Sequence, residues 1–174
     1  MRASGSDWWQ AFLRDPLSPR VSEGNMKLAK SSYRPVILTI NGEYMGIHNI
    51  RSKINSSFIS QKIDLPNNEF DMVEHGDYAE VGDLIAHNHL LEVLSEDLSV
   101  QFNFDQVEDL VNIENYTILH DVIRQMFLVN GSINHNTIAW KTKENGKWDW
   151  ILVDVDRGFI KDELPYYEIE WFIN

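Results

Sequence analysis

The spacing of apolar residues predicts a β-hairpin in the first third of the chain. Two β-rich runs, Tyr33 to Ile40 and Glu43 to Ile50, are separated by Asn41-Gly42. Asn and Gly both tolerate the positive φ that a type I′ turn demands. We therefore expect two antiparallel strands joined by a two-residue turn.

A second hairpin is predicted near the end of the sequence. It consists of a strand from Thr137 to Lys141, a turn over residues 144–147 and a returning strand from Trp148 to Asp154. Alternate residues of a strand share a face, which places Trp150, Leu152, Asp154 and Asp156 on one side. At least one of the two tryptophans of the returning strand is expected to face the core.

Helical spacing occupies the region between the two hairpins. Apolar residues three and four positions apart predict helices over 84–94 and 113–129, the longer one ended by Asn130-Gly131. A shorter helix is expected over 105–111, capped from Asn103 or Asp105.

Two other stretches give weaker patterns. Trp8, Trp9, Phe12 and Leu13 suit a short helix that stops before Pro16, and residues 18–30 suit a short helix or a loop. Residues 60–82 are polar and broken by proline and glycine, so we expect a surface excursion.

These elements predict one α+β domain over residues 1–174, with β-hairpins packed on a helical region. The 43% hydrophobic content is that of a globular protein. The formal charge of −12 argues against a nucleic-acid or anionic-membrane partner, because phosphate surfaces are held by clustered Lys and Arg. No apolar run approaches about 18 residues, so no membrane span is expected. The absence of cysteine excludes a thiol nucleophile and thiolate metal ligands.

The end of the last predicted strand carries the candidate chemistry. Asp154 and Asp156 are oxygen ligands of the kind that Mg²⁺ or Mn²⁺ takes when it bridges phosphates; the alternative is that they only form a turn. A hairpin of this length returns its end to its beginning, which makes Asn136 a candidate neighbour of Asp154. His135, beside Asn136, is a candidate ligand contact, with a plain turn residue as the alternative.

Three segments of the chain resemble the CotH kinase family, atypical protein kinases named for spore coat protein H. Residues 2–7 with Arg14-Asp15 are similar to its "R-N-x-G-x-D … R-D" stretch. Residues 33–51 are similar to its "N-G-x-Y-x-G-i-h-n-l-R-E" hairpin, and are the most specific of the three. Residues 130–136, followed by 148–159, are similar to its "N-x-D-w-x-x-N-N … W-r-w-i-l-y-D-l-D" segment.

The resemblance implies a partial kinase-like fold that transfers phosphate from ATP, with Mg or Mn, to serine hydroxyls of a protein. It implies that Asp154 binds the metal, with Asp156 as the other candidate and Asn136 as the catalytic-loop asparagine. It also implies cofactor-binding roles for Arg51 and His135, and a location outside the cytoplasm, on a cell surface or spore.

The chain departs from the family pattern in three ways. Ser132 or a neighbour stands where the family has its catalytic-loop aspartate, and Ser52 stands where it usually has glutamate. The family's nucleotide-contacting lysine lies upstream of Arg2, so we expect a fragment truncated at both ends, or a divergent member. The alternative function is therefore a non-catalytic structural or binding module, with a structural protein as its partner.

Two other enzyme or metal sites are disfavoured. His87 and His89 are two positions apart on a predicted helix and point about 200° apart, so they do not chelate one zinc ion. A haloacid-dehalogenase-type phosphatase also uses Asp-x-Asp after a strand, but it needs a long α/β region after the motif, and about eighteen residues follow Asp156 here.

Overall fold

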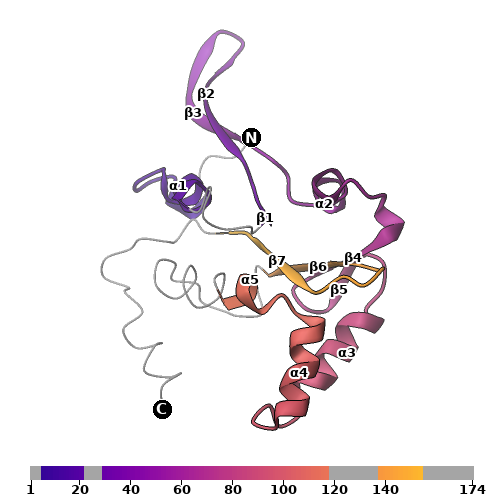
Figure 1. The fold of residues 1–174 in the computed structure, drawn as a ribbon. Helices are drawn as coiled ribbons and strands as arrows, with labels where there is room; N and C mark the ends of the chain where they lie inside the picture. Colours follow the sequence, from indigo (N-terminus) through magenta and orange to yellow (C-terminus); the bar gives the residue numbers. More distant parts are fainter. Residues whose placement is uncertain (1–4, 22–28, 118–136, 155–174) are drawn as a thin grey trace.

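The protein mixes helices and strands along its whole described length, which confirms the α+β class (Figure 1). The computed structural model describes residues 5–21, 29–117 and 137–154. Its elements are η1 Gly5–Asp7, α1 Arg14–Val21, β1 Ala29–Lys30, β2 Tyr33–Ile40, β3 Glu43–Arg51, α2 Ser56–Ile63, η2 Asn67–Glu69, β4 Phe70–Glu74, β5 Tyr78–Val81, α3 Ile85–Leu94, α4 Gln101–Leu110, α5 Ile113–Thr117, β6 Ile138–Thr142 and β7 Asp149–Leu152.

A five-stranded sheet forms the body, in the order β1-β7-β6-β4-β5. The pairs β4–β5, β4–β6 and β6–β7 are antiparallel, whereas β1 pairs with β7 in parallel. The predicted second hairpin is confirmed as β6 and β7, with a positive φ of 54° at Asn145 in its turn. β7 is shorter than expected, because it ends at Leu152.

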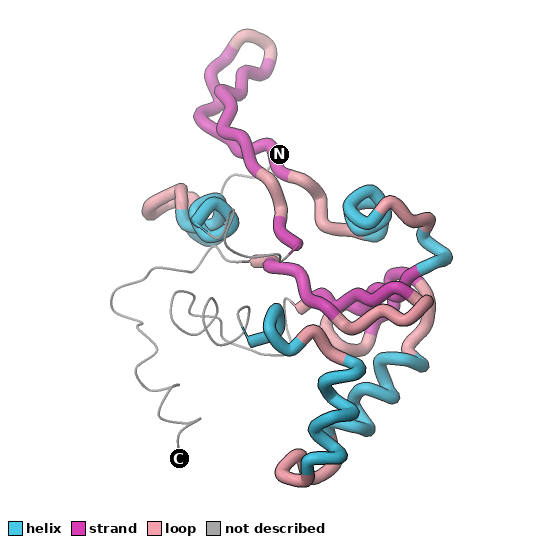
Figure 2. The backbone as a smooth tube through the Cα atoms, viewed as in Figure 1, coloured by secondary structure: helices cyan, strands magenta, loops and turns pink. Residues whose placement is uncertain are grey.

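The sheet is buried on both faces, since helices cover each of them (Figures 1 and 2). On one face Val73, Ala139 and Trp148 pack with residues of α3 and α4. On the other face Phe70 and Met72 pack with Ile59 of α2. Trp148 is completely buried, as expected for one of the two tryptophans, and successive residues of β4 alternate between the two cores.

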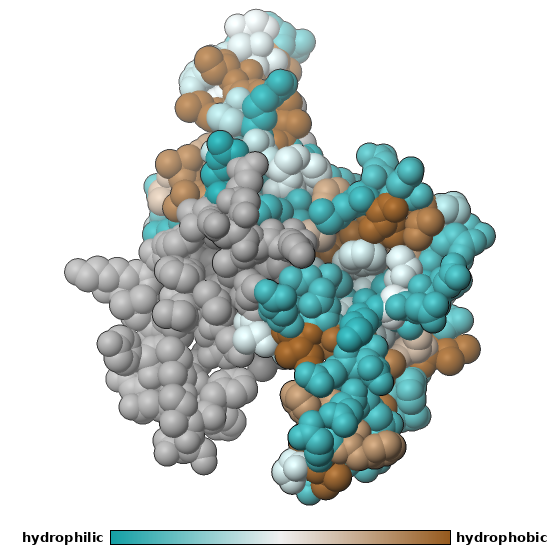
Figure 3. All heavy atoms as spheres, viewed as in Figure 1, coloured by the Kyte–Doolittle hydropathy of each residue, from teal (hydrophilic) through white to brown (hydrophobic). Residues whose placement is uncertain are grey.

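The strands β2 and β3 form a separate hairpin that projects from the body (Figures 1 and 2). Asn41 and Gly42 have φ values of 53° and 87°, so the predicted type I′ turn is confirmed. Large apolar side chains along this hairpin are exposed, for example Ile37 at 72% (Figure 3). The hairpin is therefore held to the body at its base and not along its length.

The prediction of a surface excursion over residues 60–82 is wrong. This stretch contains the end of α2, and then β4 and β5, of which β4 is a central strand with four buried residues. The hydrophobic signal is short, because only Phe70, Met72 and Val73 are apolar in β4 and turn-forming residues flank it on both sides. The turn after β4 uses positive φ at His75 and Gly76, which explains the glycine that had suggested a loop.

The prediction of a helix over Trp8 to Leu13 is also wrong. The first full helix begins at Arg14 and contains Pro16 in its first turn, where amide hydrogens have no partner within the helix. Phe12 has a left-handed φ of 63°, which interrupts any helix before it. Trp8 and Trp9 are 65% and 66% exposed, so they do not form the buried stripe that their spacing indicated.

The remaining helices lie where the sequence predicts them, but some of them begin or end at other residues. The helix predicted over 84–94 is confirmed as α3. α4 begins at Gln101 after Val100, so Asn103 and Asp105 lie inside it; the side-chain amide of Asn103 donates to the carbonyl of Asp97, 2.9 Å away. The predicted helix over 113–129 starts as α5, and its continuation and its end at Asn130-Gly131 lie outside the described residues.

Candidate functional site

Four strand ends of the body meet at one edge of the sheet. β1 and β7 run parallel, with Lys30 opposite Leu152, so both end there. β6 is antiparallel to β7 and begins at this edge, while β4 is antiparallel to β6 and ends there, with Glu74 opposite Ile138. The backbone N–H of His75 donates to the carbonyl of Thr137 at 2.9 Å, which ties the turn after β4 to the start of β6.

A hollow of about 580 Å³ opens at this edge, between the sheet and the base of the β2–β3 hairpin. One part of its wall is apolar and consists of Ile54, Ile138, Leu152 and Val153. The polar part consists of Ser31, Arg51, Ser52, Lys53, His75 and Asp154. The hollow thus combines an apolar wall with groups that carry charge of both signs, which is typical of a small-molecule site.

Serine side chains fasten the hairpin to the body beside the hollow. The Ser31 hydroxyl donates to the carbonyl of Ser52 at 2.8 Å, and the hydroxyls of Ser32 and Ser52 lie 2.7 Å apart. The backbone N–H of Ser52 donates to the carbonyl of Ser32 at 3.2 Å. Ser52, the position at which the family pattern has glutamate, therefore contributes to the joint between hairpin and sheet.

Asp154 lies just past the end of β7 in a left-handed conformation, with φ of 51°. The two-residue alternation holds inside β7, where Trp150 and Ile151 pack against opposite cores. The strand ends at Leu152, two residues before Asp154, and both residues line the hollow. Asp156, which was predicted to share their side, lies outside the described residues.

Two carboxyl groups stand close to the basic side chains of the hollow. Glu74 and Glu80 are hydrogen-bonded to each other, and the Glu80 Oε1 accepts a hydrogen bond from the Ser56 N–H at 2.7 Å. Burial raises the pKa of Glu74, and so do the charge of Glu80 and the hydrogen bond between the two carboxyl groups. The charges of His75 and Lys53 lower it. The Glu80 carboxyl group therefore lies between Glu74 and the start of α2.

The structure brings together two of the residues that the sequence indicated, Arg51 and Asp154, on one hollow. Ser132, His135, Asn136 and Asp156 lie outside the described residues, and their roles stay predictions. Sequence reasoning missed Lys53 and His75. His75 was missed because the stretch around it was interpreted as a surface excursion, and an isolated lysine after a strand gives no signal of its own.

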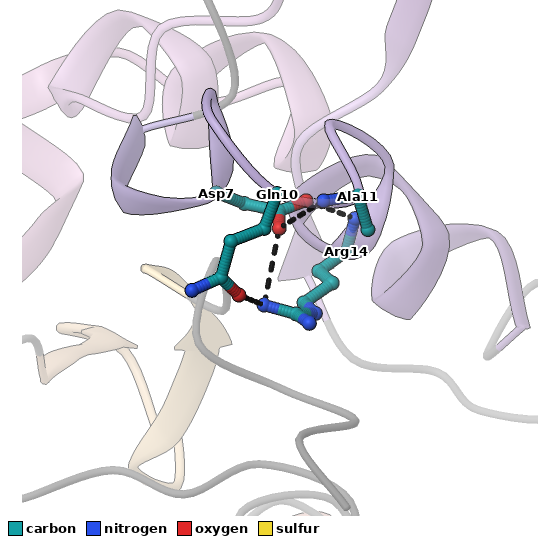
Figure 4. A network of polar contacts seen from close by, with 4 residues as sticks. All are labelled: Asp7, Gln10, Ala11 and Arg14. Carbon is teal, nitrogen blue, oxygen red and sulfur yellow. Dashed lines mark hydrogen bonds and ion pairs between the residues drawn. The ribbon is translucent and has the colours of Figure 1, made fainter.

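The first segment of the resemblance forms a closed cluster elsewhere (Figure 4). The Asp7 carboxylate accepts hydrogen bonds from the N–H groups of Ala11 and Arg14, at 3.1 and 2.9 Å. The Arg14 guanidinium lies 3.2 Å from Asp7 and also donates to the Gln10 side chain. Asp7 is 1% exposed, so this ion pair connects η1 to α1 and has no face open to a ligand.

The hollow has one carboxylate residue in its lining, Asp154, which fits a metal ion whose other ligands are phosphate oxygens and water. Among residues 5–21, 29–117 and 137–154, no three His, Asp or Glu side chains form a cluster able to hold a metal ion. Mg²⁺ commonly binds through one or two carboxylates, with waters and substrate phosphates as its other ligands, and does not need such a cluster. Asp154 is a carboxylate of that kind.

The two histidines of α3 lie in different surroundings. His87 is 7% exposed and packs edge-on against Trp148, with ring centroids 5.4 Å apart. His89 is exposed, with its Nδ1 3.8 Å from a Glu92 carboxylate oxygen. The two side chains therefore have separate surroundings, one in the core and one at the surface.

Comparison with protein families identifies the chain. A model of the CotH kinase protein family matches residues 1–164 of the 174. The chain belongs to the CotH kinase family. This membership supports a kinase-like domain and agrees with the resemblance of the three segments. A comparison with curated proteins found no match. Within the described part of this CotH family protein, no helix is both long and apolar enough to cross a membrane.

Proposed function

We propose that this CotH family domain binds a magnesium–nucleotide complex in the hollow at the sheet edge and transfers the terminal phosphoryl group to serine hydroxyls of a protein. The observation that carries the proposal is that Arg51 and Asp154, far apart in the sequence, line one hollow of nucleotide size together with an apolar wall. An apolar wall suits a nucleobase, and charged groups suit the phosphates and their metal.

The proposed roles follow from the chemistry of each side chain. Asp154 would hold Mg²⁺ or Mn²⁺, with Asn136 and Asp156 as further candidate ligands and His135 as a further nucleotide contact. The bound metal would neutralise the charge of the phosphate oxygens. The Arg51 guanidinium presents N–H donors that match phosphate oxygens. Ile54, Ile138 and Leu152 would exclude water from one side of the nucleotide.

Transfer of the phosphoryl group also needs a group that orients the attacking hydroxyl and accepts its proton. The sequence holds no Asp between Leu128 and Ile138, and Ser132 stands near the position where the family has one. A serine performs this role poorly, so slow transfer is the expected activity of the domain.

A non-catalytic nucleotide-dependent or structural module is the second candidate function. The same absence of a catalytic-loop aspartate favours it, and so does the projecting hairpin with its exposed apolar side chains. Both candidates predict a kinase-like scaffold, but only the first predicts phosphate on a protein.

A thermal-shift titration with ATP and Mg²⁺ or Mn²⁺ tests the first part of the proposal. We expect a rise in melting temperature that grows with ATP concentration and disappears in Asp154→Asn. Incubation with γ-labelled ATP and a serine-rich protein tests the second part. A melting temperature that does not respond to ATP would contradict nucleotide binding, while binding without any labelled protein would support the non-catalytic module.

A further inference from the structure

The middle of the sequence is acidic and contains no basic side chain other than histidine. Residues 63–123 hold more than half of the chain's 27 acidic residues, and all 15 Lys and Arg residues lie outside this stretch. The helices α3 and α4 belong to it, and they project from the body on the side away from the β2–β3 hairpin (Figure 1). Their far end is therefore a part of the surface where a cationic partner meets little like charge.

The α3–α4 tip, residues 94–105, exposes several large apolar side chains. Four of them fall within nine consecutive residues and are at least 36% exposed: Leu94, Leu98, Val100 and Phe102. Hydrophobic side chains are visible at this end of the helix pair in Figure 3. Single exposed apolar residues are ordinary on a protein surface, whereas a group of them at one place marks an interaction surface.

Carboxylates lie among these apolar side chains. Glu96 and Asp97 come directly before Leu98 in the connection between the helices. Asp105 comes three residues after Phe102, so both project from the same face of α4. The three acidic side chains are exposed, and none of them forms an ion pair with a Lys or Arg of the described residues. The tip thus combines apolar contact area with negative charge that has no basic partner in that part of the chain.

Hydrogen bonds from uncharged donors fix the shape of the tip. The Asp97 carboxylate accepts from the N–H and the hydroxyl of Ser99, at 3.0 and 2.7 Å. The Asp97 carbonyl accepts from the Asn103 side chain at 2.9 Å, and the Gln101 side chain donates to the Asp105 carboxylate at 2.7 Å. A surface that is ordered before binding loses less conformational entropy when a partner docks.

We infer that the α3–α4 tip is a docking surface for a basic segment of a partner protein, one in which Lys or Arg alternate with apolar residues. The apolar residues of the segment pack against Phe102 and Leu98, and its cations pair with Glu96 and Asp105. A second copy of this chain fits less well, because its formal charge of −12 brings like charge to the tip. Neither kind of contact involves the hollow, so docking does not depend on nucleotide binding.

Fluorescence anisotropy with labelled synthetic peptides tests this inference on the 174-residue protein. The probe is a peptide in which pairs of Lys alternate with pairs of Leu. One comparison peptide has Glu in place of Lys, and another has Ser in place of Leu. We expect the Lys–Leu peptide to bind and the other two to bind about tenfold more weakly, because each lacks one of the two kinds of contact.

Variants of the protein locate the binding. Phe102→Ser should weaken the Lys–Leu peptide about tenfold, as for the loss of one buried aromatic side chain. Glu96→Gln combined with Asp105→Asn should weaken it about threefold to tenfold and reduce its dependence on salt. Asp64→Asn combined with Glu69→Gln is the matched control, because it removes the same charge from exposed positions between α2 and β4, and it should leave the affinity unchanged.

The outcomes decide between this surface and its alternatives. Hydrogen exchange should show protection of residues 94–105 when the Lys–Leu peptide is bound. A peptide that does not bind, or that is weakened equally by the tip variants and by the control, would overturn the inference. Self-association of the unaltered protein in sedimentation that Phe102→Ser abolishes would also overturn it, since a second copy would then be the occupant. Circular dichroism of each variant verifies that it is folded.

Discussion

Two sets of Asp and Arg residues in this protein occupy opposite kinds of surroundings. Asp7 and Arg14 form a buried ion pair whose carboxylate oxygens are fully used by N–H groups and the guanidinium (Figure 4). Asp154 and Arg51 line a hollow at the sheet edge. Both sets belong to segments that carry the resemblance to the CotH kinase family.

The difference shows that residues of one family resemblance stand in two distinct kinds of surroundings. The Asp7–Arg14 ion pair connects η1 to α1, so it contributes to the free energy of folding. The hollow around Asp154 has an apolar wall and charged groups of both signs, and we propose that a ligand occupies it. Burial, which only the fold reveals, distinguishes the two carboxylates, since Asp7 is 1% exposed and Asp154 is only partly buried.

The largest expected effect comes from breaking the closed pair. Asp7→Asn should lower the free energy of unfolding by about 3–5 kcal/mol, because it leaves the Arg14 guanidinium without its carboxylate in a largely buried place. Urea denaturation followed by circular dichroism measures the change. Asp154→Asn is the matched variant and should change the free energy of unfolding by less than about 1 kcal/mol. Similar losses in both variants would contradict a purely structural role for Asp7 and the proposed ligand-binding role for Asp154.

A smaller effect is expected from acid, through a histidine of the body. Burial lowers the pKa of His87 below its ordinary value of 6.5. As the pH falls below 6.5, His87 of the unfolded chain becomes protonated while His87 of the folded protein stays neutral. The stability that the neutral histidine contributes is therefore complete above pH 6.5. It decreases as the pH falls from 6.5 toward the folded-state pKa. The loss is at most about 1.4 kcal/mol per pH unit for one proton.

Denaturation curves between pH 7.5 and 5 measure this dependence. His87→Phe should flatten the curve, since a neutral ring of similar shape remains against Trp148. His89→Phe, on the exposed side of the same helix, should leave the slope unchanged. An unaltered slope in His87→Phe would show that another group is responsible.

The smallest expected effect lies at the joint between the hairpin and the body. Ser32→Ala removes the partner of the Ser52 hydroxyl, which lies 2.7 Å away, and should cost about 0.5–1 kcal/mol because the pair is exposed. The same denaturation measurement applies. The loss of cooperative unfolding in this variant would mean that the hairpin depends on the joint far more than one hydrogen bond implies.

The two hairpins were predictable because their signals are local. Asn41-Gly42 needs only its own backbone to form a type I′ turn, and the alternation of β7 follows from the two cores on either side. α3 was predictable for the same reason, since one apolar stripe faces a single core.

The central strand β4 was not predictable, because its burial depends on neighbours distant in the chain. Its partners are β5 and β6, and β6 begins sixty-four residues after the end of β4, as the numbers 74 and 138 show. The site was half predicted for a related reason. Asp154 and Arg51 stand in recognisable motifs, whereas His75 reaches the hollow only because β4 is central.

The central claim is that Asp154 holds a divalent metal on a nucleotide bound in the hollow. Electron paramagnetic resonance of Mn²⁺, titrated with ATP into the unaltered protein and into Asp154→Asn, tests it most directly. We predict one bound Mn²⁺ per chain that depends on ATP in the unaltered protein and is lost in a folded Asp154→Asn. The same Mn²⁺ binding in both proteins, or none that depends on ATP in either, would contradict the claim.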